Sequence, residues 1–169
     1  MKAISQLLLL LVAVTALAGA QGWRQASDRE LQSIIPARAS VINERIETEM
    51  RTASGVTDGH GKFIATVVMI TAGYAAEGKY SDFLITQVSI KVAGVELKPG
   101  NYVFGTHRKD EDTLDLTFYE ADTGKLLGSA SAVRDNRHGA IRSLTITPPE
   151  AGKASLKIGR FAVPYSVGE

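Results

Sequence analysis

Short runs of alternating apolar and polar residues, separated by turn signals, constrain most strongly what this chain can fold into. The clearest run alternates Val88, Ile90 and Val92 with polar side chains, and residues 113–119 repeat the pattern. Because successive side chains of a strand point to opposite faces, such runs indicate half-buried β-strands. About seven strands at short spacing, with no helix between them, predict an antiparallel β-sandwich or jelly roll.

The first part of the chain, residues 21–54, is predicted to be helical instead. Ser27 and Glu30 have the spacing of a capping box, in which each side chain accepts a backbone N–H of the other residue. We therefore expect an N-terminal helical segment over 21–54 and a β-sandwich domain over 55–169.

A second helix is expected within that segment. Ile42, Ile46 and Met50 recur every four residues, which is the spacing of an amphipathic helix. A flexible leader and an edge strand are the alternative interpretations of these residues.

The first twenty residues have the pattern of a secretory signal peptide. Lys2 provides a positive start, an apolar run follows over residues 7–18, and small residues end the segment at Ala18 and Ala20. The pattern predicts cleavage before Gln21 and export to the bacterial periplasm or beyond. An uncleaved N-terminal membrane anchor is the alternative interpretation.

Composition excludes several kinds of site and partner. The chain contains no cysteine, so it has no disulfide, no thiolate metal site and no cysteine for a lipid anchor. Its 19 Lys and Arg residues nearly balance 18 Asp and Glu residues. This balance gives no electrostatic reason to expect nucleic acid or an anionic membrane surface as a partner.

Candidate ligand-binding residues fall in predicted loops. Tyr74 and Tyr80 belong to one loop, 74–83, and could offer their rings to a carbohydrate or a protein partner. Arg108 and Arg137 lie in two further loops, which could meet and bind a carboxylate or a phosphate. These two loops carry Arg108, Lys109, Arg134, Arg137, His138 and Arg142. Burial of the tyrosines and neutralisation of the arginines by nearby carboxylates are the structural alternatives.

The three histidines, His60, His107 and His138, also lie in predicted loops. Converging imidazoles could hold zinc or copper. None of the three has the short-range partner of a preformed ligand pair, so we predict solvated histidines, no metal and no cofactor. The sequence also lacks Gly-x-Ser-x-Gly, Ser-x-x-Lys and His-Glu-x-x-His motifs, and we assign no catalytic residue.

Two local motifs resemble those of known families. A Leu-x-x-Gly-x-Tyr turn within 95–104 follows an alternating strand and precedes the charged run 109–112. In this respect, residues 83–120 resemble an uncharacterised family of exported bacterial β-sandwich proteins. The turn at 57–63 resembles a hairpin of carboxypeptidase-regulatory-like, transthyretin-like domains. Both resemblances imply a β-sandwich and bring no catalytic residue.

These observations predict an exported, non-enzymatic β-sandwich protein with a binding or structural role in the bacterial periplasm or envelope. Its partner would be an unidentified protein or carbohydrate. The second hypothesis is a carbohydrate- or small-ligand-binding module that uses the aromatic loop. A hydrolase with an unrecognised site is the third.

Overall fold

A computed structural model describes residues 22–137, 139–150 and 154–168. The expected signal peptide and its cleavage site before Gln21 therefore lie outside the described residues, as does His138. Within the described residues, no helix is long and apolar enough to cross a membrane.

The described chain is built mainly of β-strands. Its helix, α1, spans Asp28–Ile34. The strands are β1 (Arg24–Gln25), β2 (Arg38–Val41), β3 (Glu44–Thr57), β4 (Phe63–Met69), β5 (Asp82–Thr86), β6 (Ile90–Val92), β7 (Val95–Leu97), β8 (Gly100–Arg108), β9 (Thr113–Glu120), β10 (Leu126–Arg134), β11 (Leu144–Ile146), β12 (Ala154–Ile158) and β13 (Phe161–Val167).

The strands form one antiparallel sheet that curls into a nearly closed barrel. The sheet order is β1-β3-β4-β5-β8-β9-β10-β13-β12-β11. Its last strand, β11, returns to lie beside β3 and β4. The backbone N–H of Ile146 donates to the hydroxyl of Ser54 on β3 across this seam, at 2.9 Å. A barrel with a seam thus replaces the expected sandwich of two separate layers.

The prediction of about seven strands is wrong, because the described residues form a sheet of 13 strands. The missed strands include β1 and β7, which contain two and three residues. Strands this short fall below the length over which alternation can be recognised.

The expected helical segment over 21–54 is wrong, because the described residues of this segment contain one short helix and several strands. The capping box of Ser27 and Glu30 begins α1, which ends at Ile34 before Pro36. The second predicted helix is wrong, because β2 and β3 form a hairpin there. Ile42 lies in the turn of this hairpin, with a φ of 53°, and is exposed, whereas Ile46 is buried on β3, so their four-residue spacing does not reflect one helix face. The expected domain boundary after residue 54 falls inside β3.

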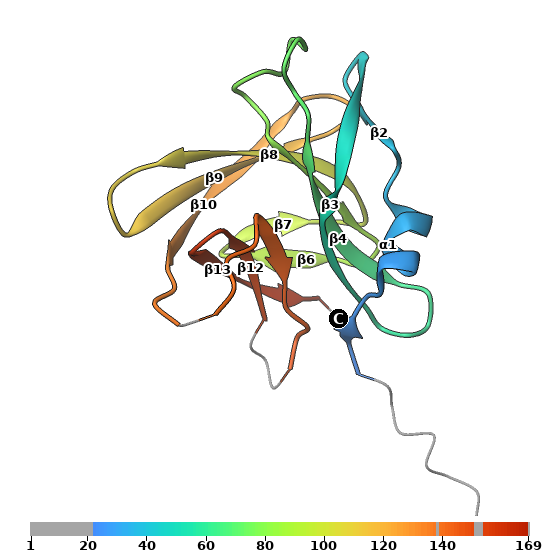
Figure 1. Cartoon of the computed structure of the whole chain (residues 1–169), viewed down its shortest axis with the longest axis vertical. Coiled ribbons are helices and arrows are strands. Elements are labelled where there is room, and N and C mark those ends of the chain that lie inside the picture. Colours follow the sequence, from blue (N-terminus) through green and yellow to red (C-terminus); the bar gives the residue numbers. More distant parts are fainter. Residues whose placement is uncertain (1–21, 138, 151–153, 169) are drawn as a thin grey trace, which may run out of the picture.

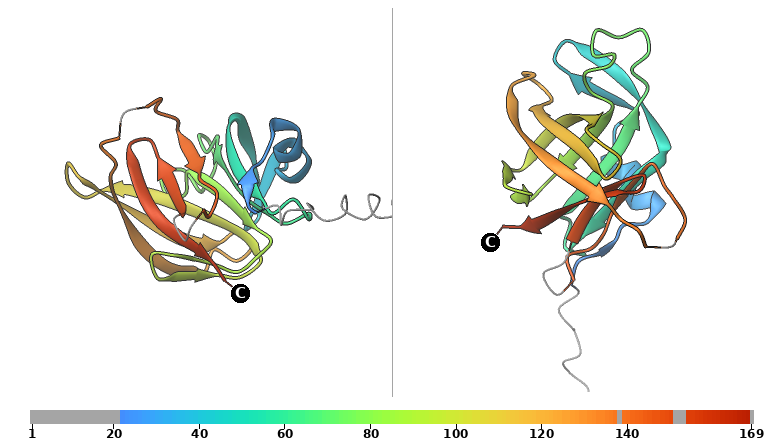
Figure 2. Two further views of the ribbon diagram at one scale, coloured as in Figure 1. Left: turned by 90° about the horizontal axis from the view of Figure 1, so that it is seen from below. Right: turned by 90° about the vertical axis from the view of Figure 1, so that its left-hand side faces the viewer.

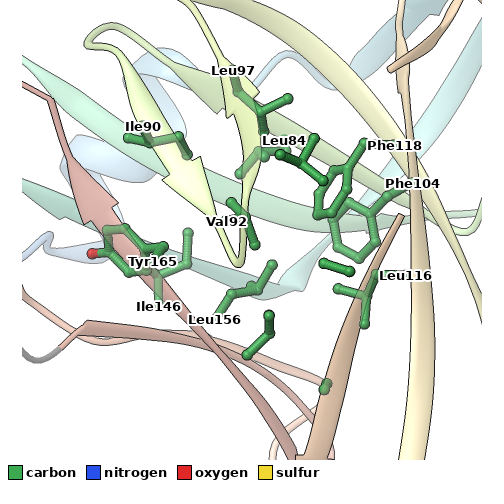
Figure 3. Packing of buried hydrophobic residues seen from close by; sticks show 14 of the residues in the cluster. Leu84, Ile90, Val92, Leu97, Phe104, Leu116, Phe118, Ile146, Leu156 and Tyr165 are labelled. Atoms are coloured by element: carbon green, nitrogen blue, oxygen red, sulfur yellow. The ribbon is translucent and has the colours of Figure 1, made fainter. Parts of the chain in front are cut away.

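The barrel interior is filled by apolar side chains from alternate positions of its strands. Leu84, Phe104 and Phe118 lie together in this core (Figure 3), and the two phenylalanine rings are 5.4 Å apart. Val92 and Leu156 join the same cluster from other parts of the chain. A barrel of this kind is therefore a packed core along most of its length.

The β6–β7 hairpin completes the barrel wall at one end of the barrel. Val92 of β6 pairs with Tyr165 of β13, and Val95 of β7 contacts Gly128 of β10. The hairpin therefore fills the gap between β10 and β13, which pair directly only at Val133 and Arg134 of β10. We call this end of the barrel the plugged end.

A second apolar cluster covers the outside of the barrel wall. Helix α1 and strand β2 lie against one side of β3 and β4, apart from the strands coloured yellow to red (Figures 1 and 2). Leu31 of α1 packs there with Val67 of β4 and Phe83 of β5. The N-terminal elements thus support the barrel wall and leave its open end uncovered.

Candidate ligand-binding site

The end of the barrel opposite the plug is open, and we call it the mouth. There β5 begins at Asp82 and β8 ends at Arg108. The strand register places Asp82 opposite Phe104 on β8 and opposite Val68 on β4. A cavity of about 550 Å³ lies at this end, lined by residues of β4, β5, β8, β9, β10, β12 and β13.

Two arginines meet over one aromatic ring at the mouth. The guanidinium carbons of Arg108 and Arg134 lie 4.8 and 5.6 Å from the centre of the Phe161 ring. Arginine stacks well on an aromatic face because its planar cation is weakly hydrated. The two predicted basic loops therefore do meet, through Arg108 and Arg134.

The same two arginines are fixed by one backbone carbonyl. Arg108 donates through Nη2 to the carbonyl oxygen of Glu111 at 2.9 Å, and Arg134 donates to that oxygen through Nε at 3.0 Å and through Nη2. Arg134 also pairs with Asp112 at 3.1 Å. Guanidinium groups that are held in this way lose little further conformational freedom when they bind a ligand.

Asp82 lines the same cavity as the arginines, from the interior face of β5. It is only 4% exposed, and its Oδ2 accepts a hydrogen bond from the Ser81 hydroxyl at 2.5 Å. No lysine, arginine or histidine of the described chain forms an ion pair with it. Burial raises the pKa of Asp82 to about 6, because a low-dielectric site disfavours the charged form.

Arg160 is the third arginine at the mouth. It lies in the turn between β12 and β13, where the backbone N–H of Asp135 donates to its carbonyl oxygen at 2.7 Å. Arg160 lines both the mouth and a smaller neighbouring cavity of about 250 Å³. Within the described part of the chain, its guanidinium forms no ion pair.

The predicted residue Arg137 lies beside the mouth rather than in it. It lines the smaller cavity and pairs with Asp135 at 2.8 Å. Lys157 binds the same carboxylate at 2.7 Å. Hydrogen bonds from Arg137 and Lys157 hold the pKa of Asp135 well below its usual range. The charge of Arg137 is thus largely neutralised by its own neighbour.

The two predicted tyrosines lie on the outer wall of the barrel. Tyr80 is 3% exposed and packs edge-on against Tyr119, with ring centres 5.1 Å apart. Tyr74 is half-buried, and its hydroxyl donates to the carbonyl oxygen of Arg45 at 3.3 Å. The buried Tyr80 ring does not present a stacking face at the surface, whereas a contact through Tyr74 stays a prediction.

The histidines do not converge in the described structure. His60 lies in the β3–β4 turn at the plugged end, whereas His107 lies near the end of β8 at the mouth. By strand rise, this separates them by roughly 20 Å. The residues that the structure describes contain no group of three or more His, Asp or Glu side chains able to hold a metal ion.

A larger cleft of about 600 Å³ lies outside the barrel, between α1, the bulge 50–53 of β3 and the segment 141–144. Its charged lining residues, Asp28, Arg51 and Arg142, are all exposed. The mouth is smaller, but it alone of the two combines a buried carboxyl group with fixed cations. We therefore take the mouth as the candidate site.

Sequence reasoning missed Asp82, Arg160 and Phe161. The signal for Asp82 is the alternation of Asp82, Leu84 and Thr86, which places an acid at an interior strand position. The prediction of one loop over residues 74–83 hides this alternation. Arg160 and Phe161 carry no such local signal, since only the closure of the barrel brings them to Arg108.

No protein-family model, curated protein or solved structure matches this chain. The resemblances to exported β-sandwich and transthyretin-like families therefore stay predictions. The candidate site is assigned from its geometry and electrostatics.

Proposed function

We propose that this protein is an exported, non-enzymatic binding protein whose barrel mouth takes a small organic anion with an apolar body. The observation that carries the proposal is the convergence of Arg108 and Arg134 on the ring of Phe161 at an open, concave end. A pair of guanidinium groups fixed before binding is suited to hold a carboxylate by charge-assisted hydrogen bonds.

The shape of the mouth supports a small ligand. A cavity of about 550 Å³ lies within the range of small-molecule sites, which are mostly apolar with a few placed polar groups. Leu114, Ile158 and Phe161 supply the apolar wall here. A straight-chain or aromatic carboxylate would place its body against this wall and its charge at the arginines.

The charge of the mouth supports an anion. Three guanidinium groups, those of Arg108, Arg134 and Arg160, line the cavity together with one carboxyl group, that of Asp82. Only Arg134 among these three forms an ion pair in the described chain. The site therefore has an excess of positive charge, even though the whole chain is nearly neutral.

The proposed place of action is the bacterial periplasm or envelope. The sequence pattern of residues 1–20 supports export. A barrel with an apolar core and no cysteine suits that compartment, because its stability does not depend on a thiol or a disulfide.

Calorimetric titration with hexanoate and 3-phenylpropionate tests the proposal. We expect both carboxylates to bind one site, and Arg134→Gln to weaken binding about tenfold. The matched control is Arg38→Gln, which removes an arginine that pairs with Glu47 on the far β2–β3 hairpin. Equal affinities for the wild-type protein and the Arg134→Gln variant would overturn the proposal.

A further inference from the structure

The position of Asp82 narrows the class of ligand, on the premise of the proposed function. We infer that the mouth takes a zwitterion, whose ammonium group meets Asp82 inside the barrel and whose carboxylate meets Arg108 and Arg134 at the rim. The ligand class is therefore an amino carboxylate with its two charges at opposite ends.

The first argument is the unused hydrogen-bonding capacity of Asp82. Ser81 donates to one carboxylate oxygen, and no other described residue donates to the second. Among the described residues, the hydroxyl of Tyr80 is the only fully enclosed side-chain polar atom that lacks a partner. The second oxygen of Asp82 is therefore not fully enclosed, and it belongs to a residue that lines the cavity.

The second argument is the charge of the group that Asp82 needs. Burial raises the pKa of Asp82 only to about 6, so its carboxyl group is mostly ionised at neutral pH. An ionised carboxylate inside a protein is stabilised best by a cation that also donates a hydrogen bond. A primary ammonium group satisfies both needs, whereas a hydroxyl group supplies only the hydrogen bond.

The third argument is that the arginines of the mouth do not fill this role themselves. Arg108 and Arg134 are turned to the carbonyl of Glu111 and form no ion pair with Asp82. Opposite charges thus line one cavity without touching each other. A ligand that contacts both Asp82 and the arginines must therefore hold its two opposite charges further apart than the two groups of a direct ion pair.

The fourth argument concerns a simple anion in the same place. The carboxylate of hexanoate, bound at the arginines, would share the cavity with the ionised carboxylate of Asp82. The two negative charges would repel each other. An ammonium group on the inner end of the ligand cancels that repulsion. The same site is therefore expected to prefer 6-aminohexanoate to hexanoate.

The test compares hexanoate with 6-aminohexanoate by calorimetry at about pH 7.5, where Asp82 is ionised. We expect the wild-type protein to bind 6-aminohexanoate at least tenfold more tightly than hexanoate. Asp82→Asn should remove this preference by weakening 6-aminohexanoate binding about tenfold while hexanoate binding is kept or improved.

The matched control is Asp115→Asn. Asp115 also accepts a hydrogen bond from a serine hydroxyl, that of Ser131 at 2.6 Å, but does so outside the mouth. This variant should leave both affinities unchanged. 4-Aminobutyrate and 8-aminooctanoate extend the series to shorter and longer separations of charge.

The outcomes separate the two proposals. If hexanoate binds through Arg134 and no amino carboxylate of the series binds more tightly, the zwitterion assignment is overturned and the anion site stands. An Asp82→Asn variant that keeps the wild-type preference for 6-aminohexanoate over hexanoate would also overturn the zwitterion assignment and leave the anion site standing. If neither hexanoate nor 6-aminohexanoate binds, both proposals are overturned.

Discussion

The two ends of this barrel are built from the same strands but contain opposite chemistry. Along the interior face of β8, Tyr102 and Phe104 are buried toward the plugged end, whereas Thr106 and Arg108 line the mouth. On β5, Leu84 is buried in the apolar core and Asp82 faces the cavity. On each of these strands, the change from apolar to polar or charged side chains occurs between two consecutive interior positions.

This difference separates stability from binding within one fold. At the plugged end, Ile90, Val92 and Leu97 remove apolar surface from water, which favours folding by about 25 cal/mol per Å². At the mouth, no cation among the described residues forms an ion pair with the buried Asp82, which disfavours folding. The packed end thus offsets the cost of burying the Asp82 carboxyl group at the mouth.

Truncation of a side chain in the apolar core of the barrel should have the largest effect on stability. Phe104 is fully buried against Phe118. Phe104→Ala should lower the free energy of unfolding by about 3–5 kcal/mol, because it leaves a large cavity. Urea denaturation measures this. The control is Thr106→Ala, one interior position nearer the mouth, which should change stability by less than about 0.5 kcal/mol. Equal effects of the two substitutions would contradict the contrast between the ends.

Neutralisation of the buried acid should stabilise the mouth. The folded pKa of Asp82 is about 6, above the value of about 4 in an unfolded chain. The folded protein therefore binds more protons between about pH 4 and pH 6, and this contribution to stability is lost as the pH rises through that range. Asp82→Asn should remove that loss and raise the free energy of unfolding at about pH 7.5 by about 1–3 kcal/mol.

Denaturation at several pH values checks this prediction. The arginines that share the cavity with Asp82 stay protonated throughout this range, so they add no slope. A variant that is less stable than the wild type at neutral pH would show that the Asp82 carboxylate is stabilised by a contact of the folded chain. A variant that is more stable but has lost its preference for 6-aminohexanoate would link the destabilising charge directly to binding.

A carboxylate at the plugged end should have the smallest effect. Glu96 of β7 pairs with Lys91 of β6 at 3.0 Å, and both side chains are exposed. Exposed pairs contribute little, so Glu96→Gln should change stability by less than about 0.5 kcal/mol and leave ligand binding intact. Thermal unfolding and the hexanoate titration are the measurements. A loss comparable to that of Phe104→Ala would mean that the hairpin depends on this ion pair rather than on its apolar side.

The sequence predicts the mainly β character of the chain and much of the interior face. The alternation of Leu114, Leu116 and Phe118 is confirmed, since all three are buried in the core. Such strands can be recognised because their pattern is local and their polar face is solvated. The seam between β3 and β11 cannot be predicted in this way, because it depends on a hydrogen bond between Ile146 and Ser54, far apart in sequence.

The candidate site shows the same limit. Arg108 was predicted as a binding residue from its charged loop, and the structure places it at the mouth. Its partners Arg134 and Phe161 come from β10 and β13, which pair only through the closure of the barrel. The N-terminal hairpin does not follow from the spacing of Ile42 and Ile46, because Ile42 lies in its turn and only the pairing of β2 with β3 reveals the two strands.

Amide NMR spectra during a titration with 6-aminohexanoate test the central claim most directly, because they report on both ends of the barrel in one experiment. We predict shifts at the mouth, around Asp82, Arg108, Arg134 and Phe161, and unchanged signals in the β6–β7 hairpin at the plugged end. Shifts centred on residues 90–97, or on the aromatic loop at Tyr74, would contradict the account.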